Sequence, residues 1–132
     1  MASAAGLESR LGHAFRDERL LEQALTHSSY VNEHPDPPLM PNERLEFLGD
    51  AVLSLVISEA LWERHPEDPE GMLTARRAAI VSARDLARIA ARIELGDYLR
   101  LGQGAERSGE RRRGSVLAST FEAVVAAVYL DG

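Results

Sequence analysis

Residues 45–62 are mostly apolar, and the polar residues within and just before this stretch follow a regular pattern. The polar side chains recur at steps of three or four residues, at Glu43, Glu46, Asp50, Ser54 and Ser58. This spacing corresponds to one stripe along an α-helix. The pattern therefore predicts a long helix that is buried on most sides and acidic along one edge.

The acids of this stripe need a partner. A carboxylate in apolar surroundings is costly unless another group balances its charge, and the stripe contains no Lys or Arg. A metal ion is one such partner. Alternatively, Glu43 and Glu46 only complement a helix N-terminus that follows an Asn42 cap. That interpretation does not account for Asp50, which lies deeper in the helix, and the spacing alone leaves both open.

A second apolar stretch, residues 115–130, repeats this arrangement near the end of the chain. Its polar residues, Ser115, Ser119 and Glu122, again follow helical spacing. Two buried helices with one acidic edge each predict that the edges face each other across a cation. An ion pair between Glu122 and an arginine is the alternative, and we favour the cation because both stripes then have one explanation.

The remaining segments also favour helices. Residues 7–15 predict a first helix, Asp17 a cap for a second, and residues 72–81 another. Ser82 and Asp85 resemble a capping box at the start of a helix that Gly96 would end. Residues 33–41 contain four prolines and predict a surface loop. Because no segment shows sustained period-two alternation, we expect an all-α, compact helical fold.

Composition narrows the class of protein. A length of 132 residues suits one domain, and the absence of Cys excludes disulfides and thiolate metal sites. We found neither an uninterrupted membrane-spanning run nor a secretory signal, and expect a cytoplasmic protein without membrane contact. The net charge of −6 argues against a general nucleic-acid binder. All 15 basic residues are Arg, which suits phosphate contacts, but we attribute this composition mainly to genome base composition.

The amino-acid sequences of several segments resemble those of one protein family. ERLEFLGDAVL, at residues 43–53, strongly resembles the signature of the ribonuclease III family, endonucleases that cut double-stranded RNA. Further similar segments lie between residues 20 and 132: LTHSS, EGMLT, ELGDYLRLG and VLASTFEAVVAAVYLD. The resemblance implies that residues 1–132 form a bacterial-type ribonuclease III catalytic domain. Family enzymes usually continue into a double-stranded-RNA-binding domain, which we do not expect in this chain.

The resemblance also implies roles for single residues. Glu46, Asp50 and Glu122 would form the acidic metal site for Mg²⁺, or Mn²⁺ in its place, with Glu46 and Glu122 as ligands and Asp50 holding and orienting the metal-bound water. Asp50 and Glu122 would be the catalytic pair. The family usually has Asp where this chain has Ser119, so Ser119 would be an auxiliary metal ligand that binds more weakly than a carboxylate. Glu43 and Glu70 match positions near the cleavage site.

Two further features could serve RNA or the fold. Residues 101–115 are rich in glycine and contain Arg107, Arg111, Arg112 and Arg113, which could contact RNA phosphates. A flexible, solvated loop is the alternative, and composition favours it. His27 could be imagined as a general base, but we interpret it as a packed, hydrogen-bonded structural residue.

The resemblance implies hydrolysis of phosphodiester bonds in double-stranded RNA, such as ribosomal and messenger RNA precursors, leaving 5′-phosphate and 3′-hydroxyl ends. It also implies a homodimer in which Phe47 packs across the interface, and the sequence contains no nucleotide-binding fingerprint. Three alternatives remain. They are a catalytically weak or structural relative that binds double-stranded RNA, a small relative that trims ribosomal RNA, and a helical interaction module without chemistry.

Overall fold

The computed structural model describes residues 3–132, and within them it contains helices and no strand. Its only β-type pairing is an isolated bridge between Thr26 and Arg100. The predicted all-α fold class is therefore confirmed. The helices are α1 (Ala4–Leu11), α2 (Glu18–Ala24), α3 (Ser28–Glu33), α4 (Glu43–Arg64), α5 (Glu70–Ile80), α6 (Ala83–Arg92), η1 (Leu95–Tyr98), α7 (Gln103–Arg107), η2 (Glu110–Arg112) and α8 (Gly114–Asp131).

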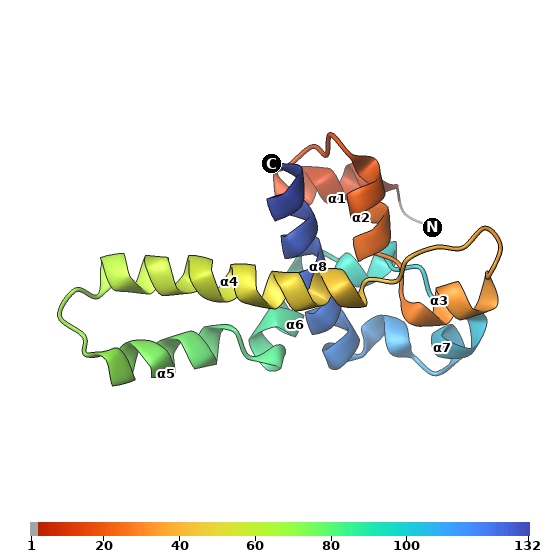
Figure 1. Ribbon diagram of the computed structural model, residues 1–132. Helices are drawn as coiled ribbons and strands as arrows, with labels where there is room; N and C mark the ends of the chain where they lie inside the picture. Colours follow the sequence, from red (N-terminus) through yellow and green to blue (C-terminus); the bar gives the residue numbers. More distant parts are fainter. Residues whose placement is uncertain (1–2) are drawn as a thin grey trace.

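The C-terminal helix α8 is the central element of the fold. It crosses the first half of α4 and packs most extensively on α4 and α6, with α2 next (Figure 1). By length and composition alone α8 could cross a membrane. Here, however, Val116, Leu117, Ala123 and Val124 are among its buried residues, and they form part of the core. Its many alanines bring neighbouring backbones close.

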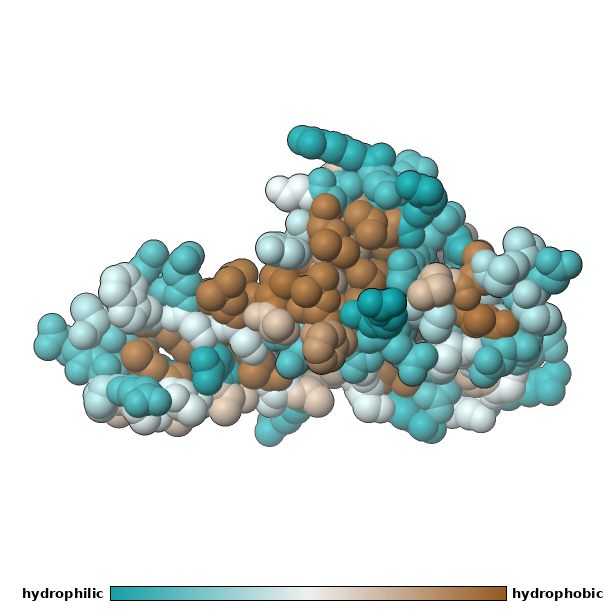
Figure 2. All heavy atoms as spheres, in the orientation of Figure 1, coloured by the Kyte–Doolittle hydropathy of each residue, from teal (hydrophilic) through white to brown (hydrophobic). Residues whose placement is uncertain are grey.

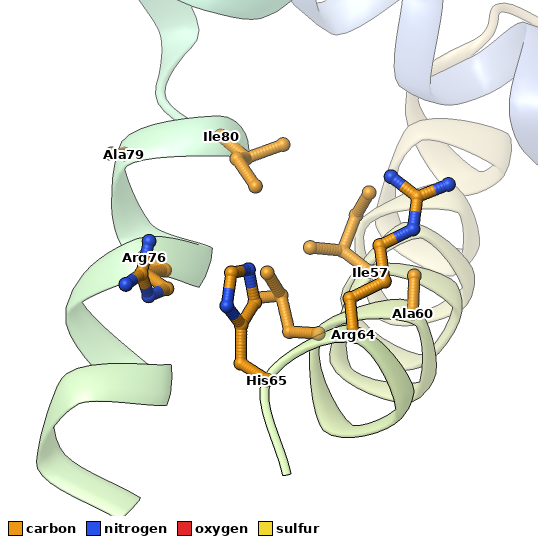
Figure 3. A pocket seen from close by; sticks show the side chains of 8 residues that line it. Ile57, Ala60, Arg64, His65, Arg76, Ala79 and Ile80 are labelled. Carbon is orange, nitrogen blue, oxygen red and sulfur yellow. The ribbon is translucent and has the colours of Figure 1, made fainter. Parts of the chain in front are cut away.

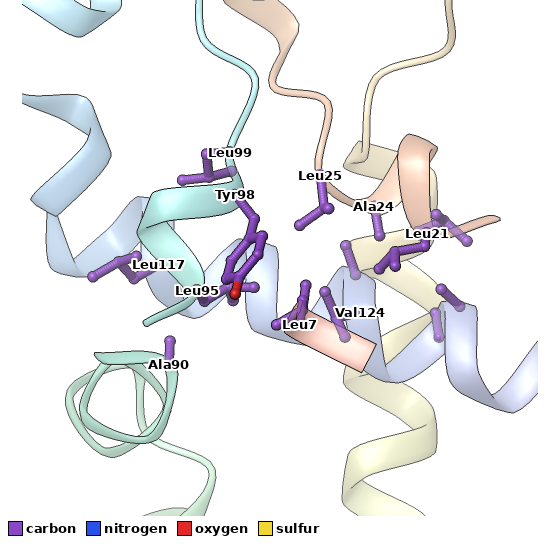
Figure 4. Close-up of a cluster of buried hydrophobic side chains, with 14 of the residues drawn as sticks. Leu7, Leu21, Ala24, Leu25, Ala90, Leu95, Tyr98, Leu99, Leu117 and Val124 are labelled. Carbon is purple, nitrogen blue, oxygen red and sulfur yellow. The ribbon is translucent and has the colours of Figure 1, made fainter. Parts of the chain in front are cut away.

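The hydrophobic core lies where α1, α2, α6 and η1 surround α8 (Figure 4). Leu7, Leu95, Leu99 and Val124 are the apolar members of the set of largest fully buried side chains. Burying a leucine side chain contributes about 1.5–3 kcal/mol to stability. The core therefore holds α8 in place, and α8 in turn positions the polar side chains along its edge, Ser115, Ser119 and Glu122.

Helices α4 and α5 run antiparallel and project from this body as an arm (Figure 1). Their packing is loose, as a pocket of about 420 Å³ between them shows. Ile57 and Ile80 face this pocket from opposite helices, and His65 lies beside it (Figure 3). One hydrogen bond across the arm runs from Arg77 Nη1 to Ser58 Oγ at 2.8 Å.

The prediction that the signature helix is buried on most sides was wrong for the single chain. Only Leu45, Gly49 and Leu61 of α4 are buried, and Phe47 is 82% exposed. The physical reason is the geometry of the arm. Only the first half of α4 lies against α8, while the second half has only α5 beside it.

Two predicted helix starts are confirmed in detail, whereas the first helix, predicted over residues 7–15, runs from Ala4 to Leu11. The side chain of Asp17 accepts a hydrogen bond from Arg19 N at 3.1 Å, and that of Ser82 accepts one from Asp85 N at 3.2 Å. Asn42 precedes α4 but does not cap it; its buried amide instead donates to the carbonyl of Ala24.

Gly96 does not end α6, which stops at Arg92. It lies in η1, where a Cβ would come within 2.7 Å of the carbonyl oxygen of Arg111. Close approach of another backbone, rather than helix termination, requires glycine there.

The carboxylate of Asp131, at the end of α8, binds the segment between α1 and α2 through hydrogen bonds. Asp131, whose side chain is 2% exposed, accepts hydrogen bonds from the backbone N–H groups of Arg16 and Asp17 at 3.0 and 2.8 Å. His13 Nε2 lies 2.8 Å from the same carboxylate. The two backbone donors, and after them His13, hold the pKa of Asp131 below its usual value.

We predict that Asp131→Asn lowers the melting temperature at pH 7, because the amide offers one acceptor and no charge. A lowered folded-state pKa means that the contribution is present above the unfolded pKa, about 3.9, and is lost as pH falls below it. The difference from wild type should therefore shrink in acid. Melting curves from pH 7 to pH 2 test this, with the exposed loop residue Asp36→Asn as control. A deficit that is the same at every pH would contradict it.

Candidate active site

The site is built where α4 and α8 cross most closely, at Gly49. A Cβ placed on Gly49 would overlap the carbonyl oxygen of Glu122. Glycine is unfavourable in a helix interior by about 1 kcal/mol relative to Ala, so its presence here needs a tertiary reason. The missing side chain lets the backbone of α8 reach α4 and sets Glu122 beside the acids of α4.

This crossing brings Glu46, Asp50 and Glu122 into one electrostatic cluster. Partial burial, a hydrogen bond to Asp50 and the negative charges of Asp50 and Glu46 together raise the pKa of Glu122 to about 7. In that hydrogen bond, the protonated Glu122 donates to the Asp50 carboxylate. The two helical stripes thus face each other, and protonation of Glu122 offsets part of their repulsion.

The donor set of the cluster suits a hard divalent cation, which prefers oxygen ligands. The side chains do not form a complete set of metal ligands. Among residues 3–132, no three Asp, Glu or His side chains converge closely enough to hold an ion. The close approach of Asp50 and Glu122 is pairwise, with Glu46 acting on Glu122 through its charge. A cation would take the place of the proton on Glu122 and balance the remaining charge.

Ser119 lies next to the cluster in a polar cleft of about 240 Å³. Glu43 and Glu46 line the same cleft from α4, and Ser115 and Ser119 line it from α8. Glu46 therefore belongs to both the cleft and the acidic cluster. The structure places the predicted ligands Glu46 and Ser119 in one cleft, which Glu43 also lines.

Glu70, the other residue predicted near the cleavage site, is not part of this cluster. It begins α5 at the far end of the arm (Figure 1). An α-helix rises about 1.5 Å per residue, so the stretch of α4 from Glu46 to Arg64 alone spans about 27 Å. Within a single chain, Glu70 does not reach Glu46, Asp50 or Glu122.

The four predicted phosphate-contacting arginines are mostly engaged within the chain. Arg111 Nη1 donates to the carbonyls of Gly96 and Leu99, both at 2.8 Å, and its Nε donates to Glu106. These bonds give Arg111 a structural role. The segment is also not a plain flexible loop, because it contains α7 and η2.

Two of the other arginines form ion pairs, Arg112 with Asp97 at 2.6 Å and Arg113 with Glu110 at 2.7 Å. Arg107 forms no ion pair within the described part of the chain. Contact of these residues with RNA stays a prediction. Arg107 is the best candidate of the four, because its charge is not balanced by an ion pair among the described residues.

Phe47 lies in an apolar surface rather than in the core. It borders a hollow of about 670 Å³ that Leu20, Met40, Leu48 and Leu130 also line. Figure 2 shows apolar side chains gathered over α4 and the adjoining part of α8. Exposed apolar residues of these two helices include Leu55, Val56, Trp62, Tyr129 and Leu130. Exposed apolar side chains gathered on one surface are typical of an interface.

Sequence reasoning missed the importance of Gly49. The residue stands in the middle of ERLEFLGDAVL, a segment that otherwise favours a helix. A glycine in such a context is itself a signal, since it indicates a packing reason for omitting the side chain. Which residue approaches it, however, depends on the tertiary arrangement.

Comparisons with known proteins agree with this architecture. A family model described as ribonuclease-III-like matches residues 17–132. Ribonuclease 3 of Geobacter sulfurreducens is 51% identical over 131 residues, which cover 99% of this chain and 53% of that protein. Ribonuclease 3 of Enterococcus faecalis is 54% identical over 125 residues, covering 95% and 54%. The chain thus spans about half the length of the curated relatives it matches.

Solved structures show the same fold. The nuclease domain of ribonuclease III from Campylobacter jejuni superposes with a TM-score of 0.91 at 38% identity, covering 98% of this chain and 87% of that one. That structure is described in terms of flexibility in the region involved in dimer formation of the domain. A second structure of the domain, at 2.2 Å resolution, gives a TM-score of 0.90 at 39% identity and covers 100% and 86%. The predicted ribonuclease III endonuclease fold is confirmed.

Proposed function

The chain belongs to the ribonuclease-III-like family, and on that premise we propose that it is the catalytic part of a metal-dependent endoribonuclease. Its substrate would be double-stranded RNA, including ribosomal and messenger RNA precursors in the cytoplasm. The observation that carries the proposal is the meeting of Glu46, Asp50 and Glu122 across the Gly49 contact. These are the acids that the family resemblance singles out.

Each residue of the cluster has a proposed task. Glu46 and Glu122 would hold Mg²⁺, or Mn²⁺, with the Ser119 hydroxyl as a weaker auxiliary ligand. Asp50, exposed and next to Glu122, would assist them and orient the attacking water. A bound divalent cation supplies a Lewis acid that lowers the pKa of the attacking water and stabilises charge on the phosphate. Hydrolysis would leave 5′-phosphate and 3′-hydroxyl ends.

A second copy of the chain is needed if Glu70 takes part in cleavage. Glu70 lies at the other end of the arm from the acids of its own chain. The exposed apolar residues of α4, including Phe47, supply a surface that a two-fold partner could cover. We infer a homodimer, in which two sites could act on opposite strands of one duplex.

We predict that Phe47→Asp converts the dimer to a folded monomer. A charge at this exposed position would face desolvation in the interface, whereas the isolated chain leaves it in water. The loss should be at least about 2 kcal/mol of dimerisation free energy. Analytical ultracentrifugation measures it, with Ile89→Asp on α6 as control for a charge added elsewhere. A monomeric wild type, or a Phe47→Asp protein that stays dimeric, would refute the interface.

The departure at Ser119 gives a separate prediction. Ser119→Asp should lower the Mg²⁺ concentration at half-maximal rate by about tenfold, because a carboxylate is a stronger ligand than a hydroxyl. Ser119→Ala, which removes the hydroxyl, should move the midpoint the other way. An Asp variant whose midpoint is unchanged or raised would place residue 119 outside the metal site.

The proposal is tested with a long, fully paired RNA duplex, with and without Mg²⁺. We expect shortened products only with Mg²⁺, and no cutting of a DNA duplex of the same sequence. Tight binding of the RNA without cutting would instead favour the catalytically weak relative, for which the loss of one carboxylate at Ser119 is the supporting observation.

A further inference from the structure

The cleft beside the acidic cluster contains more than metal-binding groups. His27 and Ser28, at the start of α3, line it together with Glu43 and Ser115. None of these four residues is needed to hold the proposed cation. The cleft is nevertheless continuous with the acidic cluster through Glu46, so a group bound in it would lie beside the residues proposed to hold the cation.

The hydrogen bonds of His27 fix which ring nitrogen carries its proton. Nδ1 accepts from the backbone N–H of Ser29 at 3.1 Å, where it caps α3, and lies 2.7 Å from Ser29 Oγ. Ser29 Oγ accepts from the N–H of Gly102 at 2.9 Å, so its own hydrogen is available for Nδ1. With Nδ1 accepting, the neutral imidazole carries its proton on Nε2. His27 is thus a structural cap, and among residues 3–132 the hydrogen bonds of its ring use Nδ1 and leave the Nε2–H without a partner.

The residues that line the cleft therefore include a potential donor, His27, potential acceptors, Glu43 and Glu46, and serine hydroxyls that serve as either. A phosphate only accepts hydrogen bonds and would be repelled by the Glu43 carboxylate, which the proposed cation does not engage. A ribose 2′-hydroxyl both donates and accepts, and it distinguishes RNA from DNA. This pattern of groups fits a hydroxyl better than a phosphate.

We propose that this cleft binds a ribose 2′-hydroxyl next to the scissile phosphate, with His27 Nε2–H as donor and Glu43 as acceptor. The inference rests on the proposed function, because it names the part of an RNA substrate that the site recognises. His27 is then a specificity-determining residue and takes no proton in the reaction.

The test uses RNA duplexes that differ by one 2′-deoxy nucleotide, moved in turn through the positions around the cleavage site. In the wild type we expect one position at which the deoxy substitution lowers kcat/KM by roughly fivefold to tenfold, the worth of one hydrogen bond. Substitution at the flanking positions should change kcat/KM by less than about twofold, well below the same hydrogen-bond value.

Two substitutions separate the two nitrogens of His27. Asn keeps an acceptor near Nδ1 and is a good N-cap, but has no group at Nε2. His27→Asn should therefore melt like the wild type and lose the position-specific penalty. His27→Gln offers an N–H near Nε2 but no cap, and should melt lower while keeping the penalty. His34→Asn, at the other end of α3, is the matched control and should keep the wild-type profile.

The inference is overturned if His27→Asn shows the same deoxy profile as the wild type. It is also overturned if His27→Asn slows cleavage of all the duplexes equally, which would indicate a phosphate contact or only a cap. Binding of the same duplexes at low salt in EDTA, followed by fluorescence anisotropy, gives a readout independent of cleavage. If RNA is bound but never cut, the proposed function fails alone and the binding profile decides the inference; a chain that does neither contradicts both.

Discussion

Replacing Glu122 with Gln is expected to reduce cleavage of double-stranded RNA by about 10³-fold or more while leaving the fold intact. The substitution keeps the size of the side chain but removes the charge that a cation needs at the α4–α8 crossing. Losing one preorganised electrostatic partner costs an active site of this kind about 10²–10³ in rate, and a direct metal ligand should cost at least as much. Single-turnover cleavage at saturating Mg²⁺ measures the effect.

The same variant should melt at a higher temperature than the wild type when no divalent cation is present. Glu122 has a pKa raised to about 7, so it opposes folding when it is ionised beside Glu46 and Asp50. A raised folded-state pKa means that stability is fully present below the unfolded pKa, about 4.3, and is lost as pH rises through 7. The advantage of Gln should therefore be largest above pH 7 and disappear in acid.

Glu67→Gln, in the exposed connection between α4 and α5, is the control for both measurements and should change neither rate nor stability. Full activity of Glu122→Gln at ordinary Mg²⁺ would remove Glu122 from the site. A difference in melting temperature between Glu122→Gln and the wild type that stays the same at every pH would contradict the electrostatic cluster.

Gly49→Ala is expected to destabilise the protein by about 3 kcal/mol or more and to abolish cleavage. In an isolated helix the same change would stabilise by up to about 1 kcal/mol. Here the new methyl group overlaps the backbone carbonyl of Glu122, which cannot move aside as a flexible side chain would. Helix α8 must shift from α4, and the acids separate even in molecules that remain folded.

Gly71→Ala is the matched control for this prediction, because it also lies in a helix and a Cβ there meets nothing within 4 Å. It should be neutral or stabilise by up to about 1 kcal/mol. Chemical denaturation of both variants gives the comparison. If Gly49→Ala is as stable and as active as Gly71→Ala, close approach at residue 49 does not build the site.

The sequence predicted the local features of the fold well. Helical periodicity found α4 and α8, and the caps at Asp17 and Ser82 are present as expected. The stripe of acids predicted which faces of α4 and α8 meet. These features depend on neighbours three or four residues apart, and such spacing is readable without a structure.

Other features depend on contacts between distant segments and could not be read from spacing. The partner of Gly49 is a backbone oxygen 73 positions later in the chain. Arg111 is held by carbonyls of η1 and its flanking residue, which its basic, glycine-rich context does not indicate. The predicted burial of α4 failed for the same reason, since the pattern shows an apolar surface but does not show whether the chain itself covers it.

Direct binding of Mn²⁺, followed by electron paramagnetic resonance, tests the claim that Glu46, Asp50 and Glu122 form one cation site. The wild type should bind Mn²⁺, and Glu122→Gln or Asp50→Asn should each weaken binding by at least about tenfold, while Glu67→Gln should not. Equal Mn²⁺ affinity in the wild type and in both site variants would contradict the account.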